Sequence, residues 1–280
     1  MRDTLRDIYD AVDEFFGGMG SRRITTYSAA CAYYLFMSLV PVIMLLVAVL
    51  QYTPLTRDVV LEAIADYVPE SLYEIVYFIV TSIFNGGRVA LTVSILLTVW
   101  SASACMKALM RGMDSVYDAE RREDYIRFSL RACIYMLIFV FILLLSFFVM
   151  VYGGKILDLI ESLMPSNHSL DFLFTLAKHL RFLVILALLA LVFSLLYKWM
   201  PARKLRFHRQ LPGAVFSAVA WAAFSFIFSF YVSLSDKFGA YGYIGTIMVA
   251  MIWIFYCFYF LLLGGFINHY IEMKRAEPEK

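Results

Sequence analysis

Six long stretches of this sequence carry no charged side chain. Asp, Glu, Lys and Arg are all missing from residues 24–56, 89–106, 132–154, 182–197, 210–235 and 238–271. Each is about as long as the roughly 20 residues that a helix needs to cross the hydrocarbon core of a bilayer. Because lipid offers the backbone no hydrogen-bond partners, such segments must be helical wherever they meet lipid. Apolar residues make up 62% of the chain and charged residues 16%, which excludes an ordinary soluble enzyme.

These stretches predict an all-α, polytopic membrane helix bundle with six transmembrane helices. The spans are expected at about residues 27–50, 89–110, 132–151, 180–199, 211–234 and 243–270, within one domain of residues 21–272. Residues 1–20 are expected to form a cytoplasmic amphipathic helix that ends at Gly17, Gly18 and Gly20. Residues 56–84 predict outer amphipathic helices, stopped by Asn85-Gly86-Gly87, and residues 273–280 a cytoplasmic tail.

The distribution of Lys and Arg predicts that both termini are cytoplasmic. The N-terminus, the segments after the second and fourth spans, and the C-terminus together hold 18 of the 24 basic residues. Basic residues concentrate on the cytoplasmic side of membrane proteins. We therefore expect a multi-pass protein of the bacterial plasma (inner) membrane.

Small polar residues form a stripe on each of the first two spans. Their spacing of three or four residues places them on one helix face: Tyr34, Ser38 and Pro41 on the first span, and Ser94, Thr98 and Ser101 on the second. The functional interpretation is a cavity or substrate path between the two helices. The alternative, which the pattern favours, is hydrogen bonding that holds the helices together.

Glycines gather in and before the sixth span. Gly239, Gly242 and Gly245 precede it or open it, and Gly264 and Asn268 lie near its end. Small residues allow close approach of two helices, so packing against the fifth span is the favoured interpretation. A hinge or a broken helix start is the alternative.

No carboxylate lies within any predicted span, and Lys107 is the one cation near membrane depth. Proton relays place ionisable groups at that depth, so the sequence argues against such a relay. The basic residues gather instead at the predicted inner rim, at Lys107, Lys198, Arg203, Lys204, Arg206 and Arg209. This rim could bind anionic lipid head groups, although enforcing the topology is the favoured alternative.

The motifs of common enzymes are missing. The four histidines match no metal motif, and neither a P-loop nor G-x-S-x-G occurs. The prediction is a protein without catalytic, cofactor-binding or metal-binding residues, with membrane lipids and not nucleic acid as partners. The oligomeric state stays open.

Several motifs occur together over residues 10–272. They are Tyr33-Tyr34-Leu35-Phe36-Met37-Ser38-Leu39-Val40-Pro41, Trp100-Ser101-Ala102-Ser103, Leu196-Tyr197-Lys198-Trp199-Met200-Pro201, Leu211-Pro212-Gly213-Ala214, and Leu263-Gly264 with Asn268. In order and topology the chain resembles the YihY/BrkB family of bacterial inner-membrane proteins. It departs from that pattern at residues 265–267, where many members carry an acidic residue. The resemblance implies a six-span plasma-membrane protein with a transport or envelope function.

Three functions follow as hypotheses. The leading one is a transporter or flippase-like protein for a lipid or an amphipathic envelope component. The second is a non-transporting membrane scaffold that supports envelope integrity. A membrane ribonuclease, a label that relatives have carried, is the least favoured because no residues suited to holding catalytic metals are evident.

Overall fold

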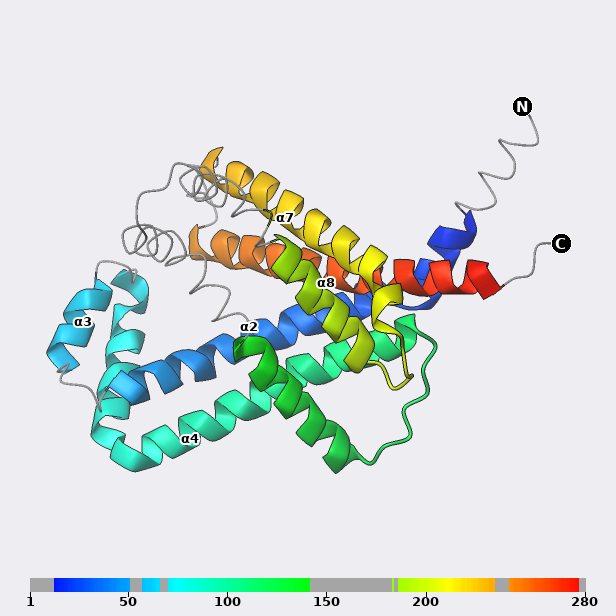
Figure 1. Ribbon diagram of the computed structural model, residues 1–280. Helices are drawn as coiled ribbons and strands as arrows, with labels where there is room; N and C mark the ends of the chain where they lie inside the picture. The colour runs from blue at the N-terminus through cyan, green and yellow to red at the C-terminus, as the bar shows by residue number, and fades with distance from the viewer. Residues whose placement is uncertain are drawn as a thin grey trace, which may run out of the picture.

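Every regular element that the structure describes is a helix. The computed structural model describes residues 13–50, 57–65, 70–141, 183, 186–234 and 242–276, and no strand occurs in these ranges. The labelled elements are α2 (Ile24–Leu50), α3 (Arg57–Ala65), α4 (Glu70–Val116), the 3-10 helix η1 (Phe207–Gln210), α7 (Leu211–Leu234) and α8 (Gly242–Ala276). Residues 13–21, 125–141 and 186–199 are helical as well (Figure 1). The predicted all-α class is confirmed for the described chain.

Four helical stretches are long and apolar enough to cross a membrane. They are Ile24–Leu45, Leu91–Val116, Phe207–Tyr231 and Ile247–Arg275, and they match the first, second, fifth and sixth predicted spans. A shorter apolar helix, Leu186–Trp199, lies where the fourth span is expected. The third predicted span falls partly outside the described residues. The total of six spans and the cytoplasmic termini stay predictions.

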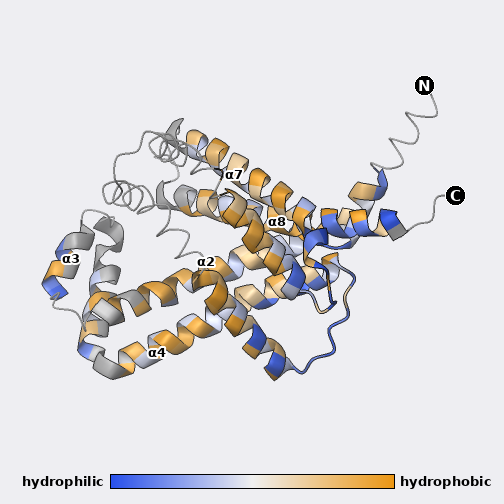
Figure 2. Ribbon diagram, in the orientation of Figure 1, coloured by the Kyte–Doolittle hydropathy of each residue, from blue (hydrophilic) through white to orange (hydrophobic). Residues whose placement is uncertain are grey.

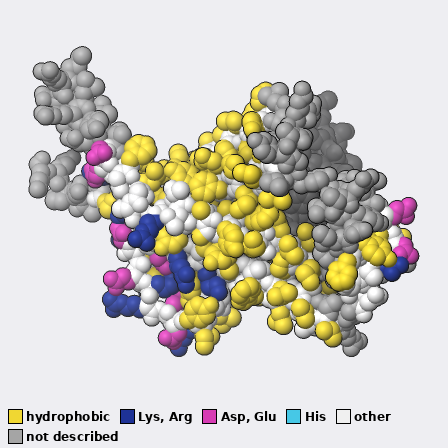
Figure 3. Space-filling model, turned by 180° about the vertical axis from the view of Figure 1, so that it is seen from behind, with side chains coloured by type: hydrophobic (Ala, Val, Ile, Leu, Met, Phe, Trp, Pro, Cys, Tyr) yellow, Lys and Arg dark blue, Asp and Glu magenta, His cyan; other side chains and the backbone are white. Residues whose placement is uncertain are grey.

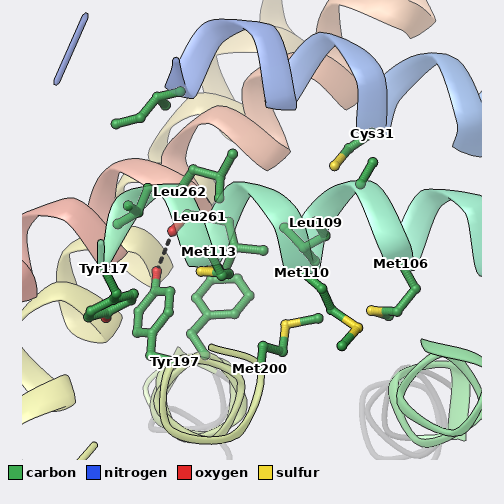
Figure 4. Packing of buried hydrophobic residues seen from close by; sticks show 14 of the residues in the cluster. Cys31, Met106, Leu109, Met110, Met113, Tyr117, Tyr197, Met200, Leu261 and Leu262 are labelled. Atoms are coloured by element: carbon green, nitrogen blue, oxygen red, sulfur yellow. Dashed lines mark hydrogen bonds between the residues drawn. The ribbon is translucent and has the colours of Figure 1, made fainter. Parts of the chain in front are cut away.

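The helices form two pairs that α8 joins. In Figure 1, α2 and α4 run side by side, and α7 lies beside α8. Helix α8 also contacts α2 and α4. The core lies where the pairs meet, and Figure 4 shows Met113 of α4 near Leu261 and Leu262 of α8, with Tyr197 beside them and Met200 next to Met110.

Polar and apolar residues occupy different parts of the molecule. Hydrophobic residues cover most of the helices, and hydrophilic residues gather where α4 and α8 end (Figure 2). From behind, an apolar surface covers the middle, and most Lys, Arg, Asp and Glu side chains lie towards this same end (Figure 3). We call this the polar end. It unites the start of α2, the end of α4, residues 200–210 and the end of α8, as the basic segments of the sequence predict.

The prediction that Gly17 and Gly18 end the first helix is wrong, although the helix ends within one residue of its predicted end at residue 20. Residues 13–21 are helical through Gly17, Gly18 and Gly20, and the chain turns only at Arg22 and Arg23, where Arg23 has φ of 52°. A Cβ at Gly18 would lie 3.2 Å from the ring of Phe266. The glycine at that position therefore permits close packing against α8 instead of ending the helix.

The predicted stop at Asn85-Gly86-Gly87 is also wrong. Helix α4 runs for 47 residues, from Glu70 to Val116, and includes this tripeptide. In Figure 1 the ribbon changes direction between the part near α3 and the long part beside α2. The outer helix and the second span are therefore one helix with a bend. Glycine lowers helix stability by only about 1 kcal/mol per residue, which flanking apolar residues can offset.

Candidate functional site

Three of the motifs that carry the family resemblance, those that contain Tyr197, Gly213 and Gly264, meet where α7 contacts α8. A Cβ added at Gly213 would collide with the carbonyl oxygen of Gly264, and one added at Gly264 would collide with Ser217 Oγ. Only glycine fits at either position, because backbone atoms of the two helices touch there. Ala214 and Ala218 of α7 are fully buried in the same contact. These small residues thus set the distance between the two helices.

Buried polar side chains satisfy the backbone around this contact. Asn268 Oδ1 accepts a hydrogen bond from the Gly213 N–H at 2.7 Å, and Asn268 Nδ2 donates to the Gln210 carbonyl at 2.9 Å. The Tyr117 hydroxyl donates to Gln210 Oε1 at 2.6 Å. Burial raises the pKa of Tyr117 well above its usual value, so its hydroxyl remains a donor. The network joins the end of α4 to η1, α7 and α8.

Tyr197 adds a second set of hydrogen bonds from the helix of residues 186–199. Its hydroxyl donates to the Leu261 carbonyl at 2.7 Å and lies 2.8 Å from Ser217 Oγ (Figure 4). Ser217 in turn donates to the Phe260 carbonyl at 2.6 Å. Tyr197 is completely buried. These contacts fix helix positions and leave no polar group open to a ligand.

An ion-pair cluster fastens the loop after α4 to residues 200–202. Asp114 Oδ1 accepts from Arg121 Nη2 at 3.0 Å and from the Ala202 N–H at 2.8 Å. Arg121 Nη2 also donates to the Met200 carbonyl at 2.8 Å. Burial alone lowers the pKa of Arg121, but hydrogen bonds to Asp114 and Glu123 outweigh it and raise the pKa above its usual value. The guanidinium therefore stays charged.

The α2–α4 groove, a cavity of about 560 Å³ between these helices, is the first candidate for ligand binding. Its apolar wall includes Tyr34, Met37, Pro41, Leu97 and Trp100. Trp100 is 69% exposed although it lies within a candidate span. The groove is therefore an open recess and not a closed packing defect.

Two cations stand at the end of the groove. Lys107 and Arg111 lie one turn apart on α4, and both line it. The Lys107 ammonium lies 5.4 Å from the ring centroid of Tyr125, which lines the groove as well. Arg111 and Tyr125 also line a larger polar cavity of about 830 Å³ that includes Arg22, Asp114 and Asp118. The groove thus adjoins a polar chamber at the polar end.

The predicted stripe residues divide between groove and packing. Tyr34, Pro41 and Ser101 line the groove, and Ser101 also donates to the Leu97 carbonyl at 2.8 Å. The other three stripe residues are not among its lining. Ser38 donates to the Leu35 carbonyl at 2.6 Å, and Thr98 donates to the Pro41 carbonyl at 2.9 Å. Ser94 Oγ is buried and has no hydrogen-bond partner within the described residues.

The predicted basic rim is not one surface. Lys107 belongs to the α2–α4 groove, whereas Arg203 and Arg209 line a separate cavity of about 360 Å³ beside the end of α8. The Lys198 ammonium lies 5.7 Å from the ring centroid of its neighbour Trp199. Lys204 and Arg206 are exposed and line neither cavity.

The structure describes Gly242, Gly245 and Gly264 of the sixth span but not Gly239 before it. Gly239 lies outside the described residues, and α8 begins at Gly242. Helix α8 is continuous from there, so neither Gly245 nor Gly264 breaks it. Gly264 and Asn268 both belong to the α7–α8 contact.

Several cavity residues escaped the sequence analysis, among them Arg111, Tyr125, His269 and Arg275. The position of Arg111 four residues after Lys107 places both on one face of α4, a signal that the sequence does contain. Tyr125 and His269 carried no such signal, because tertiary contacts alone bring them to the cavities. Among the described residues, no group of three or more His, Cys, Asp or Glu side chains is placed to hold a metal ion.

Comparison with known proteins shows the family. The model of the family described as "Virulence factor BrkB" matches residues 15–280. The chain is 33% identical over 257 residues to the "Putative ribonuclease-like protein YfkH" of Bacillus subtilis (strain 168), which covers 90% of this chain and 92% of that protein. It is 32% identical over 98 residues, 35% of each chain, to a "UPF0761 membrane protein" of Glaesserella parasuis serovar 5 (strain SH0165). No solved structure matches significantly. The chain is a multi-pass membrane protein that belongs to the BrkB virulence factor family.

Proposed function

We propose that the protein lies in the bacterial inner membrane, binds an anionic lipid or a similar amphipathic envelope component in the α2–α4 groove, and moves it between leaflets. One observation carries the proposal. A recess with apolar walls within two candidate spans ends at two adjacent cations, Lys107 and Arg111. This order of apolar and basic surface matches the order of acyl chain and head group in an anionic lipid.

The chemistry of the groove suits such a ligand. Acyl chains can lie against Met37, Leu97 and Trp100, where contact with protein replaces contact with neighbouring lipid. An anionic head group gains about 1 kcal/mol from each cation near the membrane surface. Among the described residues that line the groove there is no carboxylate to repel a phosphate. The adjoining polar cavity does contain carboxylates (Asp114, Asp118, Glu120 and Glu123), so we expect the phosphate at Lys107 and Arg111 and not deeper in that cavity.

The alternative functions need different features. A scaffold that only holds partners needs no recess between its spans, so the groove favours transport over this second hypothesis. The ribonuclease-like name of the Bacillus subtilis relative calls for groups that bind and cleave a phosphodiester. Assaying the purified protein on RNA with and without Mg²⁺ tests that name directly.

The transport proposal predicts a large effect from removing the two cations. We expect the wild-type protein, reconstituted in vesicles, to accelerate the exchange of fluorescent phosphatidylglycerol between leaflets. The double variant Lys107→Gln, Arg111→Gln should lower that rate about tenfold or more, because it removes two charge-assisted contacts to the head group. Bleaching of the outer leaflet with dithionite measures the exchange.

The control is Arg127→Gln, since the Arg127 side chain is 80% exposed and lines neither the groove nor the polar cavity. Its exchange rate should equal that of the wild type. If the wild-type protein exchanges neither anionic nor zwitterionic lipids faster than empty vesicles, the transport proposal is contradicted. The scaffold hypothesis is then the one that remains.

A further inference from the structure

We infer that a second cavity at the polar end is a binding site for a phosphate group. We call it the arginine pocket; its lining includes Arg203, Arg209, His269, Glu272 and Arg275, and its volume is about 360 Å³. It shares no lining residue with the α2–α4 groove. The inference therefore does not depend on the proposed transport.

The charges of the arginine pocket are unbalanced. Glu272 Oε1 lies 3.3 Å from Arg203 Nη2 and 3.6 Å from Arg209 Nη1. This single carboxylate holds two guanidinium groups in place but neutralises only one of them. Within the described chain, no carboxylate pairs with Arg275, the third arginine. The pocket therefore has an excess of positive charge, which a bound anion would neutralise.

Arginine determines which anion fits best. Its planar guanidinium presents several N–H donors in a fixed fork, which matches the oxygens of phosphate. Glu272 orients two of these forks, so part of the entropic cost of ordering them is met before a ligand arrives. Chloride, which is a single sphere, gains nothing from such geometry. The pocket therefore favours a multi-oxygen anion.

His269 forms part of the wall of the arginine pocket. Its side chain is 5% exposed, and its Nε2 lies 3.2 Å from Asp118 Oδ2 and 3.3 Å from Arg22 Nη2. With the proton on Nε2, the ring donates to Asp118. The Nδ1 atom is buried, so the three arginines and not His269 supply the donors for a phosphate.

The phosphate can come from two sources, a lipid head group at the membrane surface or a free phosphorylated compound. Binding to the purified full-length protein in neutral nanodiscs distinguishes them. One arm titrates inorganic phosphate and follows the rise in melting temperature, with chloride at matched ionic strength as reference. The other arm measures retention of phosphatidic acid against phosphatidylcholine by native mass spectrometry.

The decisive variant is Arg275→Gln, which removes a guanidinium without breaking an ion pair within the described chain. We expect its phosphate affinity to fall about tenfold. The matched control is Arg206→Gln, an exposed arginine outside the pocket, which should change affinity less than twofold.

The two binding measurements together identify the source of the phosphate group. A response to inorganic phosphate alone identifies a soluble ligand, and retention of phosphatidic acid alone identifies a lipid head group. The inference is overturned if the wild type responds to neither. Equal losses in Arg275→Gln and Arg206→Gln overturn it as well, because binding would then reflect the overall positive charge and not this pocket.

Discussion

The two helix pairs of this protein meet in opposite ways. At the α7–α8 contact, Gly213 and Gly264 bring backbone atoms together, and hydroxyl and amide groups satisfy the carbonyls around them. Between α2 and α4, large side chains such as Tyr34 and Trp100 border an open recess instead. Under the proposed function, the tight α7–α8 pair is a rigid frame, and the recess of the open α2–α4 pair is where a ligand enters. Helices α2 and α4 still pack closely elsewhere, as at Cys31 and Cys105.

The largest effect is expected from filling the tight contact. Gly264→Ala places a methyl group against Ser217 Oγ and the Gly213 carbonyl, where backbone cannot move aside. We expect the free energy of unfolding in detergent to fall by about 3 kcal/mol or more. Gly20→Ala is the control, because nothing lies within 4 Å of a Cβ there. It should leave stability unchanged or raise it slightly.

If Gly264→Ala melts at the wild-type temperature, the α7–α8 pair is not the rigid frame that we describe. The melting temperatures of both glycine variants, measured by intrinsic fluorescence in one detergent, decide the point.

A smaller loss is expected at the ion pair that connects the end of α4 to residues 200–202. Asp114→Ala leaves the buried Arg121 guanidinium without its main partner and frees the Ala202 N–H. Breaking one partner of a buried pair costs roughly 3 kcal/mol, and less where solvent reaches the pair, as it does at 12% and 10% exposure. Urea denaturation measures it.

Asp58→Ala, which breaks the exposed ion pair between Arg57 and Asp58, is the matched control. The Asp58 side chain is 78% exposed, so its pair with Arg57 should contribute less than about 1 kcal/mol. Equal losses in the free energy of unfolding for Asp114→Ala and Asp58→Ala would show that the stability of the polar end does not depend on Asp114.

The smallest effects are expected from replacing one buried serine with alanine in each helix pair. Ser217→Ala removes hydrogen bonds to Phe260 and Tyr197 in the tight pair, and we expect it to cost about 1–2 kcal/mol. Ser94→Ala, in the open pair, removes a buried hydroxyl that has no partner within the described residues. It should be neutral or stabilising by less than about 1 kcal/mol. Thermal unfolding of both variants in one buffer tests this, and a larger loss for Ser94→Ala would reverse the comparison.

The sequence predicts most of the helices because lipid allows few alternatives. Missing charges locate α2, α7 and α8 within a few residues, and the bounds of α7 are as predicted. The errors lie at glycines. Gly17, Gly18 and Asn85-Gly86-Gly87 signal helix ends in water, but packing against Phe266 and the apolar residues around the tripeptide keep both segments helical.

The candidate sites were only partly predictable. Helical periodicity groups Tyr34, Pro41 and Ser101, and all three line one groove. Thr98 donates to the Pro41 carbonyl of the neighbouring helix, as the favoured alternative of hydrogen bonding between the helices predicts. Ser38 instead donates to Leu35 of its own helix, which periodicity cannot predict because such bonds depend on side-chain rotamers. The arginine pocket could not be predicted from the sequence, because tertiary structure alone brings Arg209 and Arg275 together.

The length of α4 has a mechanical consequence. A straight helix of 47 residues would measure roughly 70 Å, more than twice the thickness of a hydrocarbon core of about 30 Å. The bend seen in Figure 1 makes the first part of α4 an arm, and the candidate span begins only at Leu91. No loop separates this arm from Lys107 and Asp114. A displacement of the arm can therefore be transmitted along one continuous helix to Lys107 and Asp114.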